Sequence, residues 1–200
     1  MKIYKIGIIG CGGIAKKMAA TLGKMKEVQR YAVASRNQEK AQAFANEWGF
    51  EKAYGSYEGL ANDPQVDLIY IATPHAMHYD NARMCIEKGK PVLCEKAFTA
   101  NARQAEELLS FAHEKKVFIT EAIWTRYMPL SLTIQDLLKK GVIGTPYTLS
   151  ANLSYPISDK ERIIRPELAG GALLDIGVYT LNFAAMAFGD DIAETHSACQ

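Results

Sequence analysis

A glycine-rich segment near the start of the chain carries the clearest chemical signal in the sequence. Gly10-Cys11-Gly12-Gly13-Ile14-Ala15 matches the pattern G-x-G-x-x-A and lies between a β-branched run and a segment with helical spacing. In such a loop Gly10 permits a tight turn, Gly12 lets the backbone approach a phosphate, and the helix N-terminus points N–H groups at the anion. The loop therefore predicts a binding site for a dinucleotide pyrophosphate, with Cys11 contributing only its backbone; a plain glycine turn is the alternative.

The residues that follow the second apolar run indicate which dinucleotide this loop would bind. Domains that prefer NAD usually place an acidic side chain there, which binds the ribose 2′-hydroxyl. This chain instead has Ser35 and Arg36, which would donate hydrogen bonds to a 2′-phosphate, and Arg36 could also stack on the adenine. The sequence therefore predicts NADP rather than NAD, and the simpler alternative is that Arg36 is a solvated residue at the start of a helix.

Two ionisable residues late in the chain, Asp175 and Tyr179, are four positions apart, which places both on one face of a helix. A free tyrosine has a pKa of about 10, and a nearby ammonium group lowers that value because it favours the phenolate. A tyrosine with such a neighbour is a usable proton donor and acceptor. From the residues alone, the alternative that Tyr179 packs in the core and Asp175 pairs with any cation stays open.

The elements that would position these residues alternate between strand and helix over the first 122 residues. Strands are expected at residues 3–9, 31–35, 66–72, 92–94 and 117–120, and helices at 14–25, 38–48, 76–88 and 102–115. Nearly continuous apolar strands separated by helices predict a parallel sheet that is covered on both faces. With right-handed crossovers this is a doubly wound, Rossmann-like α/β domain, which we assign to residues 1–122.

The alternation ends there, and residues 123–200 are expected to belong to a second, α+β domain. We expect a helix at 129–140, a long strand at 146–155, a helix that runs from Gly170-Gly171 to about Phe188, and the start of another strand at 192–199. One or two strands beside two helices cannot form a stable sheet of their own. We therefore expect the chain to end inside an incomplete second domain. The alternative is that strand 146–155 joins the first sheet and completes one compact domain.

Composition and charge exclude several classes of protein. The 200 residues are 48% hydrophobic and 22% charged, which is typical of a globular chain and unlike disordered, collagen-like or coiled-coil sequences. The net charge is +1, so we expect no binding to nucleic acid or to an anionic membrane. The apolar stretch 171–188 contains Asp175 and Asn182, which argues against a membrane span, and the first residues lack the pattern of a signal peptide.

The four cysteines show neither Cys-x-x-Cys pairing nor neighbouring histidines at metal-binding spacing. We therefore expect reduced thiols, no metal site and a cytoplasmic protein.

Further motifs make the sequence similar to the Gfo/Idh/MocA oxidoreductases. Beyond the glycine loop these are VDLIYIATP at 66–74, His78, VLCEK at 92–96 and GGALLDIG at 170–177. The segment EAIWTRY at 121–127 narrows the resemblance to the branch of dimeric dihydrodiol dehydrogenases and NADP-linked D-xylose 1-dehydrogenases. The resemblance extends over nearly the whole chain. It implies a Rossmann domain and a second domain whose open sheet forms a dimer interface in the full-length protein.

The resemblance also implies roles for individual residues. The nicotinamide of NADP would lie near Thr73, Pro74, Glu95 and Lys96, with His78 in a structural or cofactor-binding role. Tyr179 would be the acid/base of hydride transfer, Lys96 would lower its pKa, and Asp175 would orient Lys96 or bind a substrate hydroxyl.

On the substrate side, Trp124 and Tyr127 are expected to form an aromatic wall, and His75 to point toward the cleft. Arg162 and Arg165 would lie in a loop that closes over the substrate. The alternatives are core packing for Trp124 and solvated charge for the two arginines.

Two positions depart from the family pattern. The Glu-Lys-Pro signature reads Glu95-Lys96-Ala97 here. Because a cis bond before alanine costs several kcal/mol, we expect a trans bond and a slightly displaced Lys96. The second departure is Tyr179, which replaces the histidine that many members carry in Asp-x-Gly-x-His, and the dihydrodiol branch shares this tyrosine.

The sequence thus predicts an NADP-dependent dehydrogenase. It would transfer a hydride between nicotinamide and a secondary alcohol or hemiacetal carbon of a sugar or a cyclic trans-diol. One alternative is an NAD(P)-dependent dehydrogenase or reductase of another polyol or keto sugar, and another is a catalytically silent nucleotide-binding sensor. The expected partners are a small-molecule substrate and a second copy in a homodimer.

Overall fold

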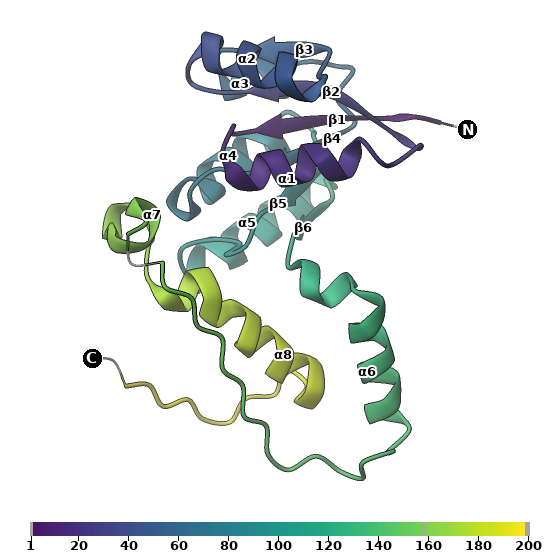
Figure 1. Cartoon of the computed structure of the whole chain (residues 1–200), viewed down its shortest axis with the longest axis vertical. Coiled ribbons are helices and arrows are strands. Elements are labelled where there is room, and N and C mark those ends of the chain that lie inside the picture. The colour runs from purple at the N-terminus through teal and green to yellow at the C-terminus, as the bar shows by residue number, and fades with distance from the viewer. Residues whose placement is uncertain (1, 158, 199–200) are drawn as a thin grey trace.

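The computed structural model describes residues 2–157 and 159–198, and its first part is built on one parallel β-sheet (Figure 1). The strands are β1 (Tyr4–Ile9), β2 (Val28–Ala34), β3 (Lys52–Tyr54), β4 (Leu68–Ile71), β5 (Val92–Cys94) and β6 (Ile119–Glu121). They lie in the order β3-β2-β1-β4-β5-β6, and every neighbouring pair is parallel. The chain winds from β1 first toward one edge and then toward the other, which confirms the predicted doubly wound fold.

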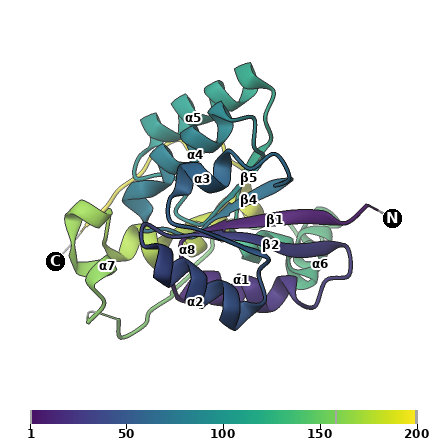
Figure 2. The same ribbon diagram turned by 90° about the horizontal axis from the view of Figure 1, so that it is seen from above.

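Helices cover both faces of the sheet. Figure 2 shows α1 (Gly13–Leu22) and α2 (Gln38–Trp48) on one face, and α3 (Tyr57–Ala61), α4 (His78–Glu87) and α5 (Ala102–Lys115) on the other. A 3₁₀ turn, η1 (His75–Met77), precedes α4. The sequence did not predict β3 or α3, which are only three and five residues long.

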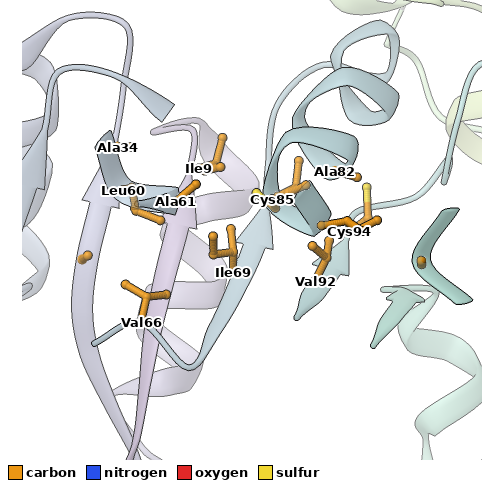
Figure 3. Packing of buried hydrophobic residues seen from close by; sticks show 14 of the residues in the cluster. Ile9, Ala34, Leu60, Ala61, Val66, Ile69, Ala82, Cys85, Val92 and Cys94 are labelled. Carbon is orange, nitrogen blue, oxygen red and sulfur yellow. The ribbon is translucent and has the colours of Figure 1, made fainter. Parts of the chain in front are cut away.

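The core of this part consists of two apolar layers, one on each side of the sheet. Figure 3 shows part of one layer, in which Ile69 and Val92 on the strands lie near Ala82 and Cys85 of α4. In the other layer, Ala15 and Ala19 of α1 and Phe44 of α2 pack against Ile8 of β1, and all four residues are buried. This close packing holds the carboxyl ends of the strands at fixed positions relative to one another.

The second part of the chain lies away from β2 and β3, on the side of β6 (Figure 1). It contains α6 (Pro129–Lys139), α7 (Glu161–Ile164) and α8 (Val178–Phe188), two 3₁₀ turns, η2 (Trp124–Tyr127) and η3 (Pro166–Leu168), and a π-helical turn, η4 (Leu173–Gly177). Among the residues described from position 124 onward, Asp175 alone is buried. The contacts of Asp175 with the first part are therefore central to how the two parts meet.

The strand predicted at 146–155 is wrong. This segment is extended, but the sheet includes no strand from it, and no ladder of backbone hydrogen bonds joins it to the other described residues. A period-two pattern favours an extended chain, yet a β-strand also needs a partner strand to accept its hydrogen bonds. The alternative that 146–155 completes the first sheet is wrong for the same reason. Residues 192–198 likewise form no strand, and Cys199 lies outside the described residues.

One apolar helical segment, Pro166–Phe188, is long enough to cross a membrane by length and composition, with a mean hydropathy of 1.4. It contains Asp175 and Asn182, and both side chains accept hydrogen bonds from residues of the preceding part of the chain. These two contacts join the segment to earlier parts of the chain.

Asp63, between α3 and β4, is a buried carboxylate that accepts hydrogen bonds from four donors. Its Oδ2 accepts from the hydroxyls of Tyr31 (3.2 Å) and Tyr54 (2.6 Å) and from Lys52 Nζ (2.8 Å), and its Oδ1 accepts from the N–H of Gln65 (2.9 Å). Burial would raise the pKa of Asp63, but the hydrogen bonds from Lys52 and Tyr54 outweigh it and hold the pKa well below its usual range.

We expect Asp63→Asn to lower the free energy of unfolding at pH 7 by about 1–3 kcal/mol, because buried donors lose their acceptor. Since the folded-state pKa of Asp63 is depressed, its contribution is fully present above the unfolded pKa of about 4 and is lost as the pH falls through the folded value. Urea unfolding at pH 7 and pH 3 should therefore show that the free energy of unfolding falls less between these two pH values in the variant than in the unmodified protein. The exposed Asp190→Asn is the control, and an unchanged acid loss in Asp63→Asn would contradict this role.

Candidate active site

The glycine loop lies between β1 and α1, at the carboxyl end of the sheet. Gly10 has a φ of +102°, and a Cβ there would lie 2.7 Å from the carbonyl oxygen of Ala72, so only glycine fits. By contrast, a Cβ on Gly12 or Gly13 would meet nothing within 4 Å. The backbone of these two residues therefore borders open space at a helix N-terminus, which is the geometry that a pyrophosphate needs.

The other residues predicted to bind the cofactor near the glycine loop differ in how much of their side chains they expose. The Cys11 side chain turns back toward the carbonyl oxygen of Ala34 (Sγ–O 3.9 Å), and Ile14 is exposed on the first turn of α1. Ser35 is nearly buried, and its hydroxyl accepts a hydrogen bond from the N–H of Asn37 (3.3 Å), while Arg36 is exposed. Cys11 thus offers its backbone, and Arg36 has its guanidinium available to a ligand.

Tyr57, which the sequence did not single out, lies next to Arg36. Burial raises the pKa of Tyr57, and the guanidinium of Arg36 partly offsets that rise. A tyrosine at the start of a short helix has no recognisable pattern, so no signal in the sequence would have identified it.

Thr73 and His78 tie together the loops at the ends of β4 and β5. The His78 ring is fully buried, and its two nitrogens lie 2.7 Å from the carbonyl oxygen of Ala97 and 2.8 Å from that of Thr73. The hydroxyl of Thr73 accepts from the side-chain amide of Asn81 (3.1 Å). Burial lowers the pKa of His78. Carbonyl oxygens approach both ring nitrogens, and a neutral imidazole donates to one of them. His78 therefore supports the loops that face the cleft. Pro74 is half-buried next to Thr73.

The expectation of a trans peptide between Lys96 and Ala97 is wrong, because this bond is cis. The loop is fixed by hydrogen bonds on both sides of the peptide. The Ala97 carbonyl binds the His78 ring, and the N–H of Phe98 donates to Glu121 Oε1 (2.9 Å). In this loop Lys96 contacts Asp175 in the second part of the chain.

Glu95 is buried at the end of β5. Its Oε1 accepts from the hydroxyl of Tyr70, a fully buried residue of β4, and its Oε2 accepts from the N–H of Lys96 (3.2 Å). Burial raises the pKa of Glu95. The carboxyl group of Glu95 is thus held next to Lys96. Its partner Tyr70 was not predicted as a site residue, because it lies within the apolar sequence of β4.

Lys96 and Asp175 join the two parts of the chain through an ion pair in which Asp175 is buried and Lys96 half-buried. Lys96 Nζ donates to the Asp175 backbone oxygen (2.6 Å) and to its Oδ1 (2.9 Å), and the guanidinium of Arg162 donates to the same Oδ1. The Asp175 residue is only 4% exposed. Burial alone would raise the pKa of Asp175, but the hydrogen bonds from Arg162 and Lys96 outweigh it and lower the pKa.

Tyr179 lies one turn further along, and the structure corrects the expected direction of its pKa. Burial raises the pKa of Tyr179, whereas Lys96 was expected to lower it. The ammonium is paired with Asp175 and lies over the Tyr179 ring, 5.4 Å from its centroid. It therefore faces the ring rather than the hydroxyl, and its charge is balanced by Asp175. The hydroxyl oxygen of Tyr179 instead lies 3.1 Å from Nε1 of Trp124.

The residues predicted on the substrate side are only partly brought together. His75 is buried, with its Nδ1 3.1 Å from the carbonyl oxygen of Ala169, and burial lowers its pKa. Trp124 is 55% exposed beside Tyr179. Tyr127 is 63% exposed, and its hydroxyl lies 3.3 Å from that of Thr120, so it contacts no other predicted site residue.

The structure places Arg162 in the short helix α7 rather than in a loop, with Arg165 at the end of that helix. Arg165 pairs with Glu161 and Glu167, and it is Arg162 that reaches Asp175. The two arginines are three positions apart, and the sequence pattern alone does not distinguish them.

A stripe of polar side chains on η4 and α8 makes these contacts. Asp175 meets Lys96, Tyr179 meets Trp124, and Asn182 accepts from Nε of Arg126. Behind Tyr179 lies a small cavity of about 100 Å³ between η2, α6 and α8. A larger hollow of about 440 Å³ surrounds Arg30 at the opposite ends of the strands, away from all of these side chains. In residues 2–157 and 159–198, no cluster of three or more His, Cys, Asp or Glu residues has the geometry of a metal site.

Comparison with known families gives two matches. Residues 4–122 match the profile described as "Oxidoreductase family, NAD-binding Rossmann fold", and residues 131–200 match the profile described as "GFO/IDH/MocA C-terminal domain".

Among curated proteins, a trans-1,2-dihydrobenzene-1,2-diol dehydrogenase from Xenopus laevis is 41% identical over 97% of this chain and 59% of its own length. A D-xylose 1-dehydrogenase (NADP(+)) from Hypocrea jecorina is 41% identical over 90% of this chain and 51% of its own length. The chain therefore spans between 51% and 59% of the length of these two relatives.

Among solved structures, a 3-ketoreductase variant from Actinomadura kijaniata, in complex with TDP-benzene and NADP, has a TM-score of 0.83 and 29% sequence identity. The match covers 95% of this chain and 57% of that chain.

Proposed function

The chain belongs to the Gfo/Idh/MocA oxidoreductase family, and from this premise we propose that it is an NADP-dependent dehydrogenase. It would transfer a hydride between nicotinamide and a secondary alcohol or hemiacetal carbon of a sugar or a cyclic trans-diol. The observation that carries the proposal is the meeting of Lys96, Asp175 and Tyr179 at the carboxyl ends of the strands. The names of the two curated relatives, a diol dehydrogenase and a xylose dehydrogenase, support the same substrate classes.

The residues present fit the cofactor. The open space over Gly12 and Gly13 suits a pyrophosphate, and the exposed Arg36 with Ser35 suits a 2′-phosphate. Other residues would line the rest of the cofactor site, namely Gly10, Cys11, Ile14, Thr73, Pro74, Glu95 and Lys96. We assign His78 the indirect role of shaping the loops at Thr73 and Ala97. When bound, NADP supplies the hydride chemistry at C4 of its nicotinamide.

The side chains of the site would handle the proton of the substrate hydroxyl. The hydroxyl of Tyr179 is the proposed proton carrier. Lys96 is held by Asp175 over the tyrosine ring, where it can donate a hydrogen bond to a substrate oxygen. Arg162 and the exposed indole of Trp124 border the same region and would contact the substrate, with His75 behind them. Arg165 and Tyr127 remain weaker candidates because their partners lie elsewhere.

A steady-state assay with a panel of aldoses, cyclic trans-diols and keto sugars tests this function. We expect NADP-dependent turnover with an aldose or a trans-diol. Turnover only with a keto sugar would favour the alternative of a reductase, which the solved 3-ketoreductase neighbour supports. Tight NADP binding without turnover on any substrate would favour a nucleotide-binding sensor.

The cofactor preference is tested by Arg36→Ala. Removing a charged hydrogen bond typically costs about 1.5–3 kcal/mol, so the affinity for NADP should fall about 10- to 150-fold. The affinity for NAD should stay nearly unchanged, because NAD has no 2′-phosphate. Titration calorimetry with both cofactors measures the two effects. Lys26→Ala is the control, because this lysine is exposed in the turn between α1 and β2. Equal losses for NADP and NAD would overturn the assignment.

We also propose the domain roles, location and assembly. Residues 1–122 would form the dinucleotide-binding domain, and residues 123–200 would contribute to the substrate and dimerisation domain. Free, buried thiols at Cys85 and Cys94 support a reducing, cytoplasmic environment. We propose that the protein forms a homodimer and acts on a small molecule, and sedimentation analysis would test the assembly. The net charge of +1 agrees with a protein that binds neither nucleic acid nor an anionic membrane.

A further inference from the structure

The contact between Trp124 and Tyr179 has a defined direction. The indole nitrogen of Trp124 can donate a hydrogen bond but cannot accept one. The hydroxyl oxygen of Tyr179, 3.1 Å away, must therefore be the acceptor. The phenolic proton then points away from Trp124 and stays available to another acceptor. The two rings meet edge to face, with centroids 6.2 Å apart and an interplanar angle of 67°.

We propose that Trp124 is a positioning residue that orients the Tyr179 hydroxyl and stabilises its phenolate. This inference rests on the proposed role of Tyr179 as proton carrier. A donor bound to the phenol oxygen strengthens its hydrogen bond when the tyrosine loses its proton, so it favours the ionised form. Trp124 would thus do what the sequence assigned to Lys96, in addition to forming a wall for the substrate.

The surroundings of Tyr179 support this division of roles. Lys96 Nζ is engaged by Asp175 and lies over the ring, 5.4 Å from its centroid. Within the part of the chain that the structure describes, Trp124 makes the only hydrogen bond to the Tyr179 hydroxyl. Burial raises the pKa of Tyr179, and the Trp124 hydrogen bond opposes that rise.

The position of the indole is fixed from both ends of the contact. Trp124 is the first residue of η2, separated by two residues from the end of β6. Its backbone N–H donates to the carbonyl oxygen of Ala122 (2.9 Å), and the N–H of Ala122 donates to the carbonyl oxygen of Cys94 at the end of β5 (2.7 Å). Two residues later, Arg126 donates to Asn182 on α8, less than one turn beyond Tyr179. The turn η2 and the helix α8 are therefore joined at two points, which holds the indole N–H against the phenol.

The first test does not need turnover. The chain has two tryptophans, Trp48 and Trp124, so a ¹⁵N NMR spectrum shows two indole N–H signals. The Trp124 signal should shift during an alkaline titration with a midpoint above 10, because burial raises the pKa of Tyr179 from 10.0. In Tyr179→Phe this titration should disappear, while the Trp48 signal stays the same in both proteins. A Trp124 signal that ignores Tyr179→Phe would overturn the proposal, whether or not the enzyme is active.

The second test uses catalysis. Trp124→Phe keeps an aromatic ring but removes the N–H, so the limb of the oxidation rate that rises with pH should move upward by about half to one pH unit. The same substitution at Trp48 should leave that limb in place. A Trp124→Phe enzyme with a higher KM and an unmoved limb would show that the indole is only a substrate wall. Absence of turnover in the unmodified protein would instead count against the proposed function and would leave the NMR result to decide this inference.

Discussion

Replacement of Tyr179 by phenylalanine is expected to lower kcat by about 10²- to 10⁴-fold, the usual contribution of a general acid–base group. The substitution keeps the ring that lies under Lys96 and against Trp124, and it removes the hydroxyl that would carry the proton. NADP affinity should stay within a few-fold, because Tyr179 is not among the residues proposed to line the cofactor site. Steady-state kinetics and calorimetric NADP binding on the same preparation measure both effects.

Tyr147→Phe is the matched control, because this tyrosine is 90% exposed and contacts none of the site residues discussed above. Lys96→Met should also lower kcat, and the double variant with Tyr179→Phe should lose less than the product of the two single losses, since both residues serve one proton transfer. Near-normal turnover of Tyr179→Phe would mean that the tyrosine only packs, and the proton would then have to move through Asp175 or His75.

Alanine at Gly10 should mainly lower the stability of the fold, whereas alanine at Gly12 should mainly weaken NADP binding. Gly10→Ala should lower the free energy of unfolding by about 2–4 kcal/mol, because the new methyl group meets the Ala72 carbonyl and the residue is held at a positive φ. Gly12 has a φ of −86° and a Cβ position with no neighbours, so Gly12→Ala should change stability by less than about 1 kcal/mol. Urea denaturation followed by circular dichroism measures both values.

Gly12→Ala, which should leave stability nearly unchanged, should weaken NADP binding. The methyl group of Gly12→Ala enters the space that the pyrophosphate would fill, so affinity should fall about 5- to 150-fold in an otherwise stable protein. Calorimetric titration checks this, with the unmodified chain as reference. A Gly12→Ala protein that binds NADP as tightly as the unmodified chain would contradict the phosphate loop, however stable it is.

The sequence predicted the helices and strands best where residues at both ends define them. Helix α2 follows Asn37, whose side chain accepts the N–H of Lys40, and it ends at Gly49 in the left-handed conformation. Both ends lie where the sequence places them. The three-residue β3 and the five-residue α3 are too short to show a period. β3 forms by pairing with the edge of β2, and α3 forms by packing Leu60 and Ala61 on the sheet. Both contacts exist only in the folded protein.

The candidate site was predictable within one continuous helical segment, η4 and α8, and not where distant segments of the chain meet. The spacing of Asp175 and Tyr179 placed both on one face of a helix, and the structure turns that face toward the first part of the chain. Which atom Lys96 approaches depends on the docking of that helix, so the direction of the Tyr179 pKa could not be derived from residue types. The choice of Arg162 over Arg165 depends on the same docking.

The turn that leads into α8 has a consequence for how this segment can change over generations. In η4 the N–H of Val178 reaches the carbonyl of Leu173, five residues back instead of the four of an α-helix. Each residue of an α-helix adds a rotation of about 100°, so loss of one residue here would swing Tyr179 and Asn182 away from their partners while Asp175 stayed on Lys96. Side chains along the segment can be exchanged during evolution, but its length cannot. Descendants that keep this geometry must align through residues 173–182 without a gap.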